Sequence, residues 1–234
     1  MIRFLACVAF TLLVQLPVDA QDAATKRAAA KRPARAPNPA MVTIEDVPGL
    51  PRVLLIGDSI SAGYTLPTRE LLKGKANLHR IKANGGPTTR GLESIDKWLG
   101  DGHWDLIHFN WGIHDLRHMP NGERQVEPAE YESNLRTLVA RLKQTGATLV
   151  FATTTPIPKG KLNPDRTFGD ETEYNAIATR VMKENNVAIN DLHGYIMPQF
   201  DKLHRPADLH YLPEGSDYLA KKVAAEIESR LTPR

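Results

Sequence analysis

The sequence predicts an α/β domain in which helices cover both faces of a parallel sheet. From about residue 43 onward, short apolar runs alternate with longer amphipathic stretches, and turn signals rich in glycine and proline separate them. The apolar runs are unbroken, which is typical of strands buried on both faces. No internal repeat interrupts this order, so residues 43–234 fit a single domain.

The first half of this domain contains three predicted strands and two predicted helices. The first strand spans residues 53–56, and a turn of small residues follows it. The second strand is followed by the sequence Asn-Gly-Gly-Pro at 84–87, which is a strong turn signal. The other elements expected here are a short helix over 68–75, the second strand over 78–83, a helix over 88–99 and a third strand over 106–111.

The second half continues the pattern with three helices and two strands. The clearest helix spans residues 127–145, because apolar side chains recur there at helical spacing and Gly146 stands where a helix would end. Because helices separate the strands, we expect the sheet to be parallel, with right-handed crossovers. The remaining elements are strands over 148–153 and 187–192 and helices over 172–183 and 215–231.

The first 42 residues differ from the domain. Residues 1–20 combine an early arginine, an apolar run over 4–16 and the sequence Val-Asp-Ala at 18–20, a pattern typical of a secretory signal peptide. This run is shorter than the roughly 20 residues of a membrane span, so no stable span is expected; a retained N-terminal anchor is the alternative. Residues 21–42 are rich in Ala, Pro, Lys and Arg and indicate a flexible linker. We therefore expect an exported protein, either periplasmic or extracellular.

Charge and cysteine content exclude several classes of function. The chain carries a net charge of +3, but residues 1–42 hold six basic and two acidic side chains, which leaves 24 Lys and Arg against 25 Asp and Glu in the domain. A nucleic-acid-binding domain would need a basic face, and this balance does not supply one. The only cysteine, Cys7, lies in the expected signal peptide, so the mature protein would have no disulfide, thiolate metal site or cysteine nucleophile.

The turn after the first strand contains the first candidate nucleophile, Ser59. In open α/β sheets the chemistry takes place at the carboxyl ends of the strands, and a serine in this turn also lies near the start of the next helix. The serine could instead be a simple helix cap. Three further stretches at strand or helix ends carry unusual residues: Gly86, the segment 112–115 and His210.

These four stretches resemble, in order, blocks I, II, III and V of the SGNH (GDSL-type) hydrolases. They are GDSIS at 57–61, NGG at 84–86, GIHD at 112–115 and DLHYLPEGSDYLA at 208–220. A single GDS motif is weak evidence, but four blocks in order are specific and span nearly the whole domain. The resemblance implies a three-layer α/β/α sandwich of the flavodoxin-like type, with about five parallel strands. It also implies a serine esterase activity that needs no metal or organic cofactor.

The resemblance further implies a role for each matching residue. Ser59 would be the nucleophile and His210 its general base, and the Ser59 and Gly86 N–H groups would bind the oxyanion. Block III normally provides an asparagine as a third oxyanion donor, but this chain has His114 there. An imidazole N–H can donate the same hydrogen bond. Asn110 is the alternative donor.

Block V also departs from the family pattern, which is Asp-x-x-His. The residue three positions before His210 is Ala207, and the nearest acid is Asp208, two positions before. In an extended segment, residues i and i+2 share a face, so Asp208 could still orient the imidazole. The alternative is that Asp208 points away and a backbone carbonyl orients the ring. We take Asp208 as the third member of the triad, because triads are defined by geometry rather than spacing.

Several other residues near the expected site admit two interpretations. Asn110, Trp111 and Asp115 could line the substrate cavity, although tryptophans are more often core residues and Asp115 fits a structural role. His108, His114 and His118 raise the possibility of zinc, but they lack the usual ligand spacing, so no metal is expected.

The loops expected to rim the site, residues 114–127 and 159–170, are polar and contain few long apolar side chains. A lipase needs an apolar acyl groove, so we expect a short acyl group, such as acetyl, on a carbohydrate. The alternatives are a lysophospholipase or thioesterase of the same family, and a carbohydrate-binding envelope protein on a catalytically decayed hydrolase fold. The oligomeric state is open.

Overall fold

A computed structural model of the chain describes residues 38–231. Its centre is a five-stranded sheet in the order β2-β1-β3-β4-β5, and every neighbouring pair is parallel. This is the flavodoxin-like strand order, so the predicted α/β/α fold class is confirmed. The strands are β1 (Arg52–Ile56), β2 (Asn77–Arg80), β3 (Leu106–Phe109), β4 (Thr148–Ala152) and β5 (Ala188–Asn190).

Alternate strand residues point to opposite faces of the sheet and form two separate cores. Leu54 and Ile56 of β1 join one core, whereas Val53 and Leu55 join the other. All four side chains are at most 2% exposed. Helices therefore cover both faces, as the unbroken apolar run predicts.

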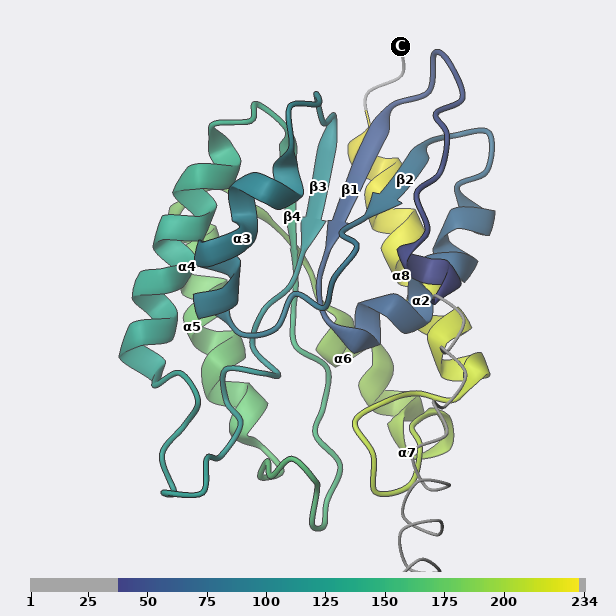
Figure 1. Ribbon diagram of the computed structural model, residues 1–234. Helices are drawn as coiled ribbons and strands as arrows, with labels where there is room; N and C mark the ends of the chain where they lie inside the picture. The colour runs from purple at the N-terminus through teal and green to yellow at the C-terminus, as the bar shows by residue number, and fades with distance from the viewer. Residues whose placement is uncertain (1–37, 232–234) are drawn as a thin grey trace, which may run out of the picture. The chain divides into compact units, whose positions relative to one another are not determined.

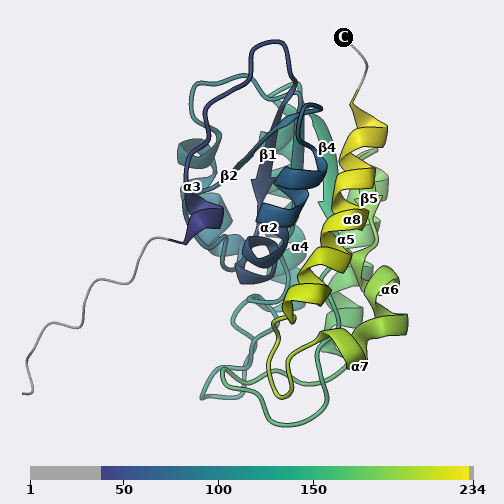
Figure 2. The same ribbon diagram turned by 90° about the vertical axis from the view of Figure 1, so that its right-hand side faces the viewer.

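Figure 1 shows the two helical layers on either side of the sheet. One layer contains α3 (Thr88–Leu99), α4 (Pro128–Lys143) and α5 (Asp170–Glu184), in which α3 packs against α4 and α4 against α5. The other contains α2 (Ser59–Leu71) and α8 (Pro213–Arg230), which pack against each other. The carboxyl ends of the strands face the bottom of Figures 1 and 2, where the long loops gather.

The first helix is longer than predicted. We expected a short helix over 68–75, but α2 begins at Ser59 and ends at Leu71, with Pro67 inside it. The Asp58 carboxylate caps this helix by accepting from the Ile60 N–H at 2.8 Å and the Ser61 N–H at 3.4 Å. Thus Ser59 occupies the first position of a helix rather than a loop.

The other differences concern element ends and short elements. The second, third and fifth strands end two or three residues earlier than expected; in addition, the second begins one residue earlier and the fifth one residue later. The sequence predicts no helix or strand between residue 192 and the last helix. The segment between β5 and α8 contains α6 (Leu192–Ile196), the 3₁₀ turn η2 (Met197–Gln199) and α7 (Phe200–Leu203), and such short elements give too few turns for a periodic signal.

The described residues include a short element that precedes the expected boundary at 43. A 3₁₀ turn, η1 (Pro39–Met41), lies against α2, and its Ala40 is 1% exposed. The Arg69 guanidinium donates to the carbonyls of Pro39 and Val42, which secures the turn. The end of the expected linker therefore belongs to the domain. The expected signal peptide, 1–20, and the rest of the linker lie outside the described residues. Within residues 38–231, no helix is both long and apolar enough to cross a bilayer.

Candidate active site

Ser59 and His210 are 151 residues apart in sequence, and the fold brings them into contact. The Ser59 Oγ lies 2.7 Å from the His210 Nε2. Ser59 follows β1 at the carboxyl edge of the sheet, and His210 lies in the loop just before α8. Because α2 and α8 pack side by side on one face, the start of each helix is held near that of the other.

The Asp208 carboxylate contacts the opposite side of the imidazole. Its Oδ1 lies 2.6 Å from the His210 Nδ1 and accepts the His210 backbone N–H at 3.1 Å. The segment is a turn rather than the extended stretch we expected: the Arg205 N–H donates to the His210 carbonyl at 2.8 Å, and Ala207 has a φ of +53°. This turn folds the acid back onto the ring, so a spacing of two residues suffices.

The electrostatics of this contact favour a charged carboxylate. Partial burial acts to raise the pKa of Asp208, but the hydrogen bonds from the His210 ring and backbone outweigh it, so the pKa lies below its usual value. The side chains remain accessible, at 42% for His210 and 38% for Asp208. Ser59, His210 and Asp208 thus form one continuous hydrogen-bonded chain that opens to solvent.

The Ser59 N–H is a backbone donor with no hydrogen-bond partner among residues 38–231. As the first residue of α2, Ser59 has an N–H with no partner inside the helix, because the Asp58 cap bonds to the next two residues. Arg80 stabilises the preceding turn, because its guanidinium donates to the carbonyls of Gly57 and Asp58 at 2.9 and 2.7 Å.

Gly86 lies beside this turn, but its N–H already has a partner. The Gly85 N–H donates to the Gly57 carbonyl at 2.9 Å, which joins the two loops. The Gly86 N–H donates to the Asn84 Oδ1 at 2.9 Å. An oxyanion would therefore have to share or replace this bond. Gly86 has a φ of +62°, a left-handed conformation in which L side chains are strained.

His114 lines the same cavity as Ser59 and His210. Burial lowers the pKa of His114; nearby Asp58 opposes the shift, whereas Arg166, Arg117 and Arg90 add to it. The imidazole is therefore neutral at pH 7, with one ring nitrogen that can donate a hydrogen bond.

Two residues that we expected to line the substrate cavity belong to the interior instead. Trp111 is 1% exposed and packs against Phe109, with ring centroids 5.9 Å apart. Asp115 is fully buried, and its Oδ1 accepts from the Thr88 N–H at 2.7 Å and the Thr88 hydroxyl at 2.5 Å. This contact joins the loop that contains His114 to the start of α3. Burial raises the pKa of Asp115 to about 7, although the Thr88 bonds oppose the shift.

Asn110 also does not face the main cavity. Its side chain donates to the Ala152 carbonyl at 2.8 Å and lines a separate small cavity, together with Asp58 and Thr154. The amide therefore connects β3 to β4, and it is not placed as the substitute for His114.

The histidines considered for zinc lie in different environments. His108 is buried within β3, with its Nε2 3.1 Å from the Asn190 Nδ2, and burial lowers its pKa to about 4. His118 contacts Arg124 and Asp170 instead. Among residues 38–231, no group of three His, Cys, Asp or Glu side chains is arranged to hold a metal ion.

The cavity in front of Ser59 has a volume of about 520 Å³. The loops that follow β3 and β4 and the loop before α8 form its walls. Its lining combines polar and aliphatic side chains. Besides Ser59, His114 and His210, the wall contains Ile60, Ile113, Leu162 and Leu209, and two arginines, Arg117 and Arg166.

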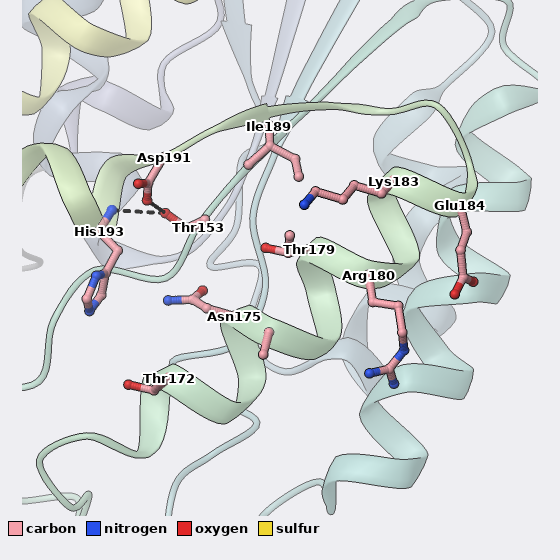
Figure 3. A pocket seen from close by; sticks show the side chains of 11 residues that line it. Thr153, Thr172, Asn175, Thr179, Arg180, Lys183, Glu184, Ile189, Asp191 and His193 are labelled. Carbon is pink, nitrogen blue, oxygen red and sulfur yellow. Dashed lines mark hydrogen bonds between the residues drawn. The ribbon is translucent and has the colours of Figure 1, made fainter.

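A wider cavity of about 780 Å³ lies elsewhere, beside α5 and β5, and Figure 3 shows its lining. The Thr153 hydroxyl bonds to the Asp191 carboxylate and to the His193 N–H, so these groups support the loop between β5 and α6. Lys183 and Arg180 come from α5. The side chains that line this cavity include no serine or cysteine beside a histidine, so we place the candidate active site at Ser59.

Comparison with solved structures finds the same fold in known enzymes. The acetyl xylan esterase AlAXEase superposes with a TM-score of 0.65 at 18% identity, over 75% of this chain and 99% of that one. A lipase/acylhydrolase from Enterococcus faecalis gives a TM-score of 0.68 at 21% identity, over 79% and 99%. An acetylxylan esterase from Geobacillus stearothermophilus gives 0.63 at 20% identity, over 76% and 94%.

Sequence comparison gives the family directly. No curated protein matches the chain significantly. The model of the GDSL-like lipase/acylhydrolase family matches residues 55–218, which is more than half of the sequence and includes Ser59 and His210. These residues run from β1 into α8 and include all five strands except the first few residues of β1. The chain therefore belongs to the GDSL-like lipase/acylhydrolase (SGNH) family of carboxylic ester hydrolases.

Proposed function

We propose that the protein is a serine esterase that forms an acyl-enzyme on Ser59. The observation that carries this proposal is the hydrogen-bonded chain from the Ser59 Oγ through the His210 imidazole to the Asp208 carboxylate. A nucleophile, a base within hydrogen-bond reach and a group that orients the base are the parts that acyl transfer requires. A serine-to-alanine variant of the Geobacillus enzyme is described as a catalytic mutant, which supports the assignment of a serine.

In the proposed mechanism the His210 Nε2 removes the proton from the Ser59 hydroxyl as the oxygen attacks the ester carbonyl. The tetrahedral intermediate collapses, and the protonated His210 returns that proton to the departing alcohol. Water then attacks the acyl-enzyme with His210 again as base, which releases the acid and regenerates Ser59. The Asp208 carboxylate holds the ring and stabilises the imidazolium in both steps.

The oxyanion would be bound by the Ser59 N–H, the Gly86 N–H and the neutral His114 imidazole. Loss of one such donor costs about 3–4 kcal/mol of barrier. We therefore expect His114→Ala to reduce kcat by about two to three orders of magnitude, and His114→Asn, which restores an amide donor, to recover most of the loss. Equal activity of His114→Ala and the parent would remove His114 from the mechanism.

For the substrate we propose a short acyl ester, such as an acetyl group, on a carbohydrate outside the cytoplasm. The polar rim loops and the acetyl xylan esterases among the similar structures support this choice. The aliphatic side chains in the cavity favour a second candidate, a lysophospholipase or thioesterase with a longer acyl group. A series of p-nitrophenyl esters separates them, since kcat/KM falls with chain length in the first case and rises in the second.

The primary test is p-nitrophenyl acetate hydrolysis by the parent, Ser59→Ala and His210→Ala, with the exposed Ser229→Ala as the matched control. We expect both site variants to lose almost all activity and Ser229→Ala to retain it. A folded parent that binds acetylated glycans but hydrolyses no ester would instead support the decayed, carbohydrate-binding alternative.

A further inference from the structure

Two arginines on the wall of the Ser59 cavity have no carboxylate partner. Arg117 comes from the loop after β3 and Arg166 from the loop after β4, and both line the cavity together with Ser59 and His210. Within residues 38–231, neither forms an ion pair. Other arginines of the domain do, among them Arg124, Arg136, Arg141, Arg180 and Arg230.

Arg166 is buried, although the loop around it is exposed. Arg166 is only 4% exposed, whereas residues 163–165 and 167–168 are exposed. The Arg166 Nε donates to the Ile113 carbonyl at 2.6 Å and the Nη1 to the Pro164 carbonyl at 3.2 Å. Two backbone carbonyls thus fix the guanidinium, and its Nη2 has no partner within the described part of the chain.

The Arg117 side chain has fewer hydrogen bonds than that of Arg166. Its guanidinium makes no hydrogen bond to any described residue, and its Nε is buried without a partner. A polar group that is buried without a partner costs free energy, and a buried charge costs more. The Arg117 Nε and the Nη2 of the buried Arg166, which have no partner among the described residues, belong to side chains on one cavity wall, where a bound molecule would supply that partner.

The charges around the pair do not neutralise it. Burial and the neighbouring Arg117 lower the pKa of Arg166 to about 10, and Asp58 acts in the opposite direction, so Arg166 stays protonated at neutral pH. Asp58 is engaged as the cap of α2, and Asp208 is engaged by His210. Two arginines and one carboxylate, Asp208, line the cavity, so these three side chains together carry one formal positive charge.

We propose that Arg117 and Arg166 bind a carboxylate carried by the ester substrate, and that the enzyme thereby selects acidic esters. This inference rests on the proposed esterase function of Ser59. A guanidinium presents its N–H groups in a planar fork that matches a carboxylate, and such charge-assisted bonds are among the strongest in proteins. A volume of about 520 Å³ is large enough for a sugar acid in front of Ser59. The carboxylate lies on either the alcohol or the acyl side of the scissile ester.

The experiment compares acidic substrates with neutral analogues of nearly the same shape. The alcohol side is probed with O-acetylated oligogalacturonate and its methyl ester, and the acyl side with mono-p-nitrophenyl succinate and its methyl ester. We expect kcat/KM to be about tenfold or more higher for the acid in one of the two pairs. The preference should decrease as NaCl is raised, because salt screens partly exposed charges.

Variants assign the preference to the arginines. Arg117→Gln and Arg166→Lys should each reduce the ratio of acidic to neutral kcat/KM about tenfold, whereas the matched control Arg141→Gln, on the outer surface of α4, should not change it. Arg117→Gln removes no protein hydrogen bond, so it tests the proposal even if Arg166→Lys fails to fold.

A parent that hydrolyses p-nitrophenyl acetate without preferring either acid would overturn this inference and leave the esterase proposal intact. An unchanged ratio in both variants, or an equal decrease in Arg141→Gln, would also overturn it. No hydrolysis of any ester would refute the esterase proposal itself.

Discussion

The contribution of Asp208 to catalysis can be worked out from its contacts, and its unusual spacing makes this the most informative residue to change. Asp208→Ala removes the 2.6 Å bond to the His210 Nδ1 and the 3.1 Å bond from the His210 N–H. A hydrogen bond to a charged group contributes about 1.5–3 kcal/mol. Both side chains are about two-fifths exposed, and water weakens the contact, so we take about 2 kcal/mol. That corresponds to a decrease of about thirtyfold in kcat/KM.

The assay is p-nitrophenyl acetate hydrolysis at pH 7.5 (about one unit above the ordinary histidine pKa), with the exposed Asp201→Ala on α7 as control. Asp208→Asn should lose nearly as much, because an amide cannot stabilise the imidazolium. In a Ser59→Ala background, Asp208→Ala should cause no further loss, since members of a triad act as a unit. Asp208→Ala activity within twofold of the parent, with the fold intact, would refute the reasoning and assign the orientation of His210 to the backbone or to solvent.

The remaining predictions concern stability. Asp115 keeps its proton to about pH 7 in the folded state but only to its ordinary pKa when unfolded. As the pH rises from about 4 to 7, the unfolding free energy of the parent should therefore fall by up to about 4 kcal/mol relative to that of Asp115→Asn. The same pH dependence of the urea unfolding free energy in both proteins would exclude this. Gly91→Ala should destabilise by about 1–3 kcal/mol, because a Cβ there would lie 2.9 Å from the Trp111 ring; an unchanged melting temperature would contradict the packing. Asp170→Ala should cost about 1–3 kcal/mol by leaving the partly buried Arg124 unpaired. The pKa of Asp170 lies below 3.8, so its contribution to the unfolding free energy should be present above about pH 4 and disappear in acid. A stability difference between Asp170→Ala and the parent that stays constant down to pH 2 would argue against this.

Periodic segments were predictable from the sequence, and α2 shows where such prediction stops. The strand β1 and the helix α4 follow directly from an unbroken apolar run and a regular apolar stripe. In contrast, α2 contains Gly63 and Pro67, which are both poor helix formers. The Asp58 cap and the packing on α8 stabilise this helix. These contacts come from outside the segment or from its first turn, so propensity alone does not reveal them.

The candidate site divides in the same way. Motifs singled out Ser59 and His210, because nucleophile and base occur in recognisable blocks at the ends of strands and helices. The sequence did not predict that Trp111 is buried in the core, because a large side chain after a buried strand can point in either direction. Arg166 carried no sequence signal at all. Its neighbours form a polar loop, and only the folded loop shows that this one side chain is turned inward beside the cavity.

The two departures from the family pattern have one feature in common. At block V the backbone compensates for the missing residue: the left-handed Ala207 reverses the chain, so that the Asp208 carboxylate reaches the His210 ring from two positions away. At block III the environment of the side chain compensates: burial keeps His114 neutral and places it on the cavity wall, where an imidazole N–H can replace the amide. The 2.7 Å contact between the Ser59 Oγ and the His210 Nε2 is present although both supporting positions differ from the family pattern. The joint change therefore favours an active esterase over a binding protein on an old scaffold.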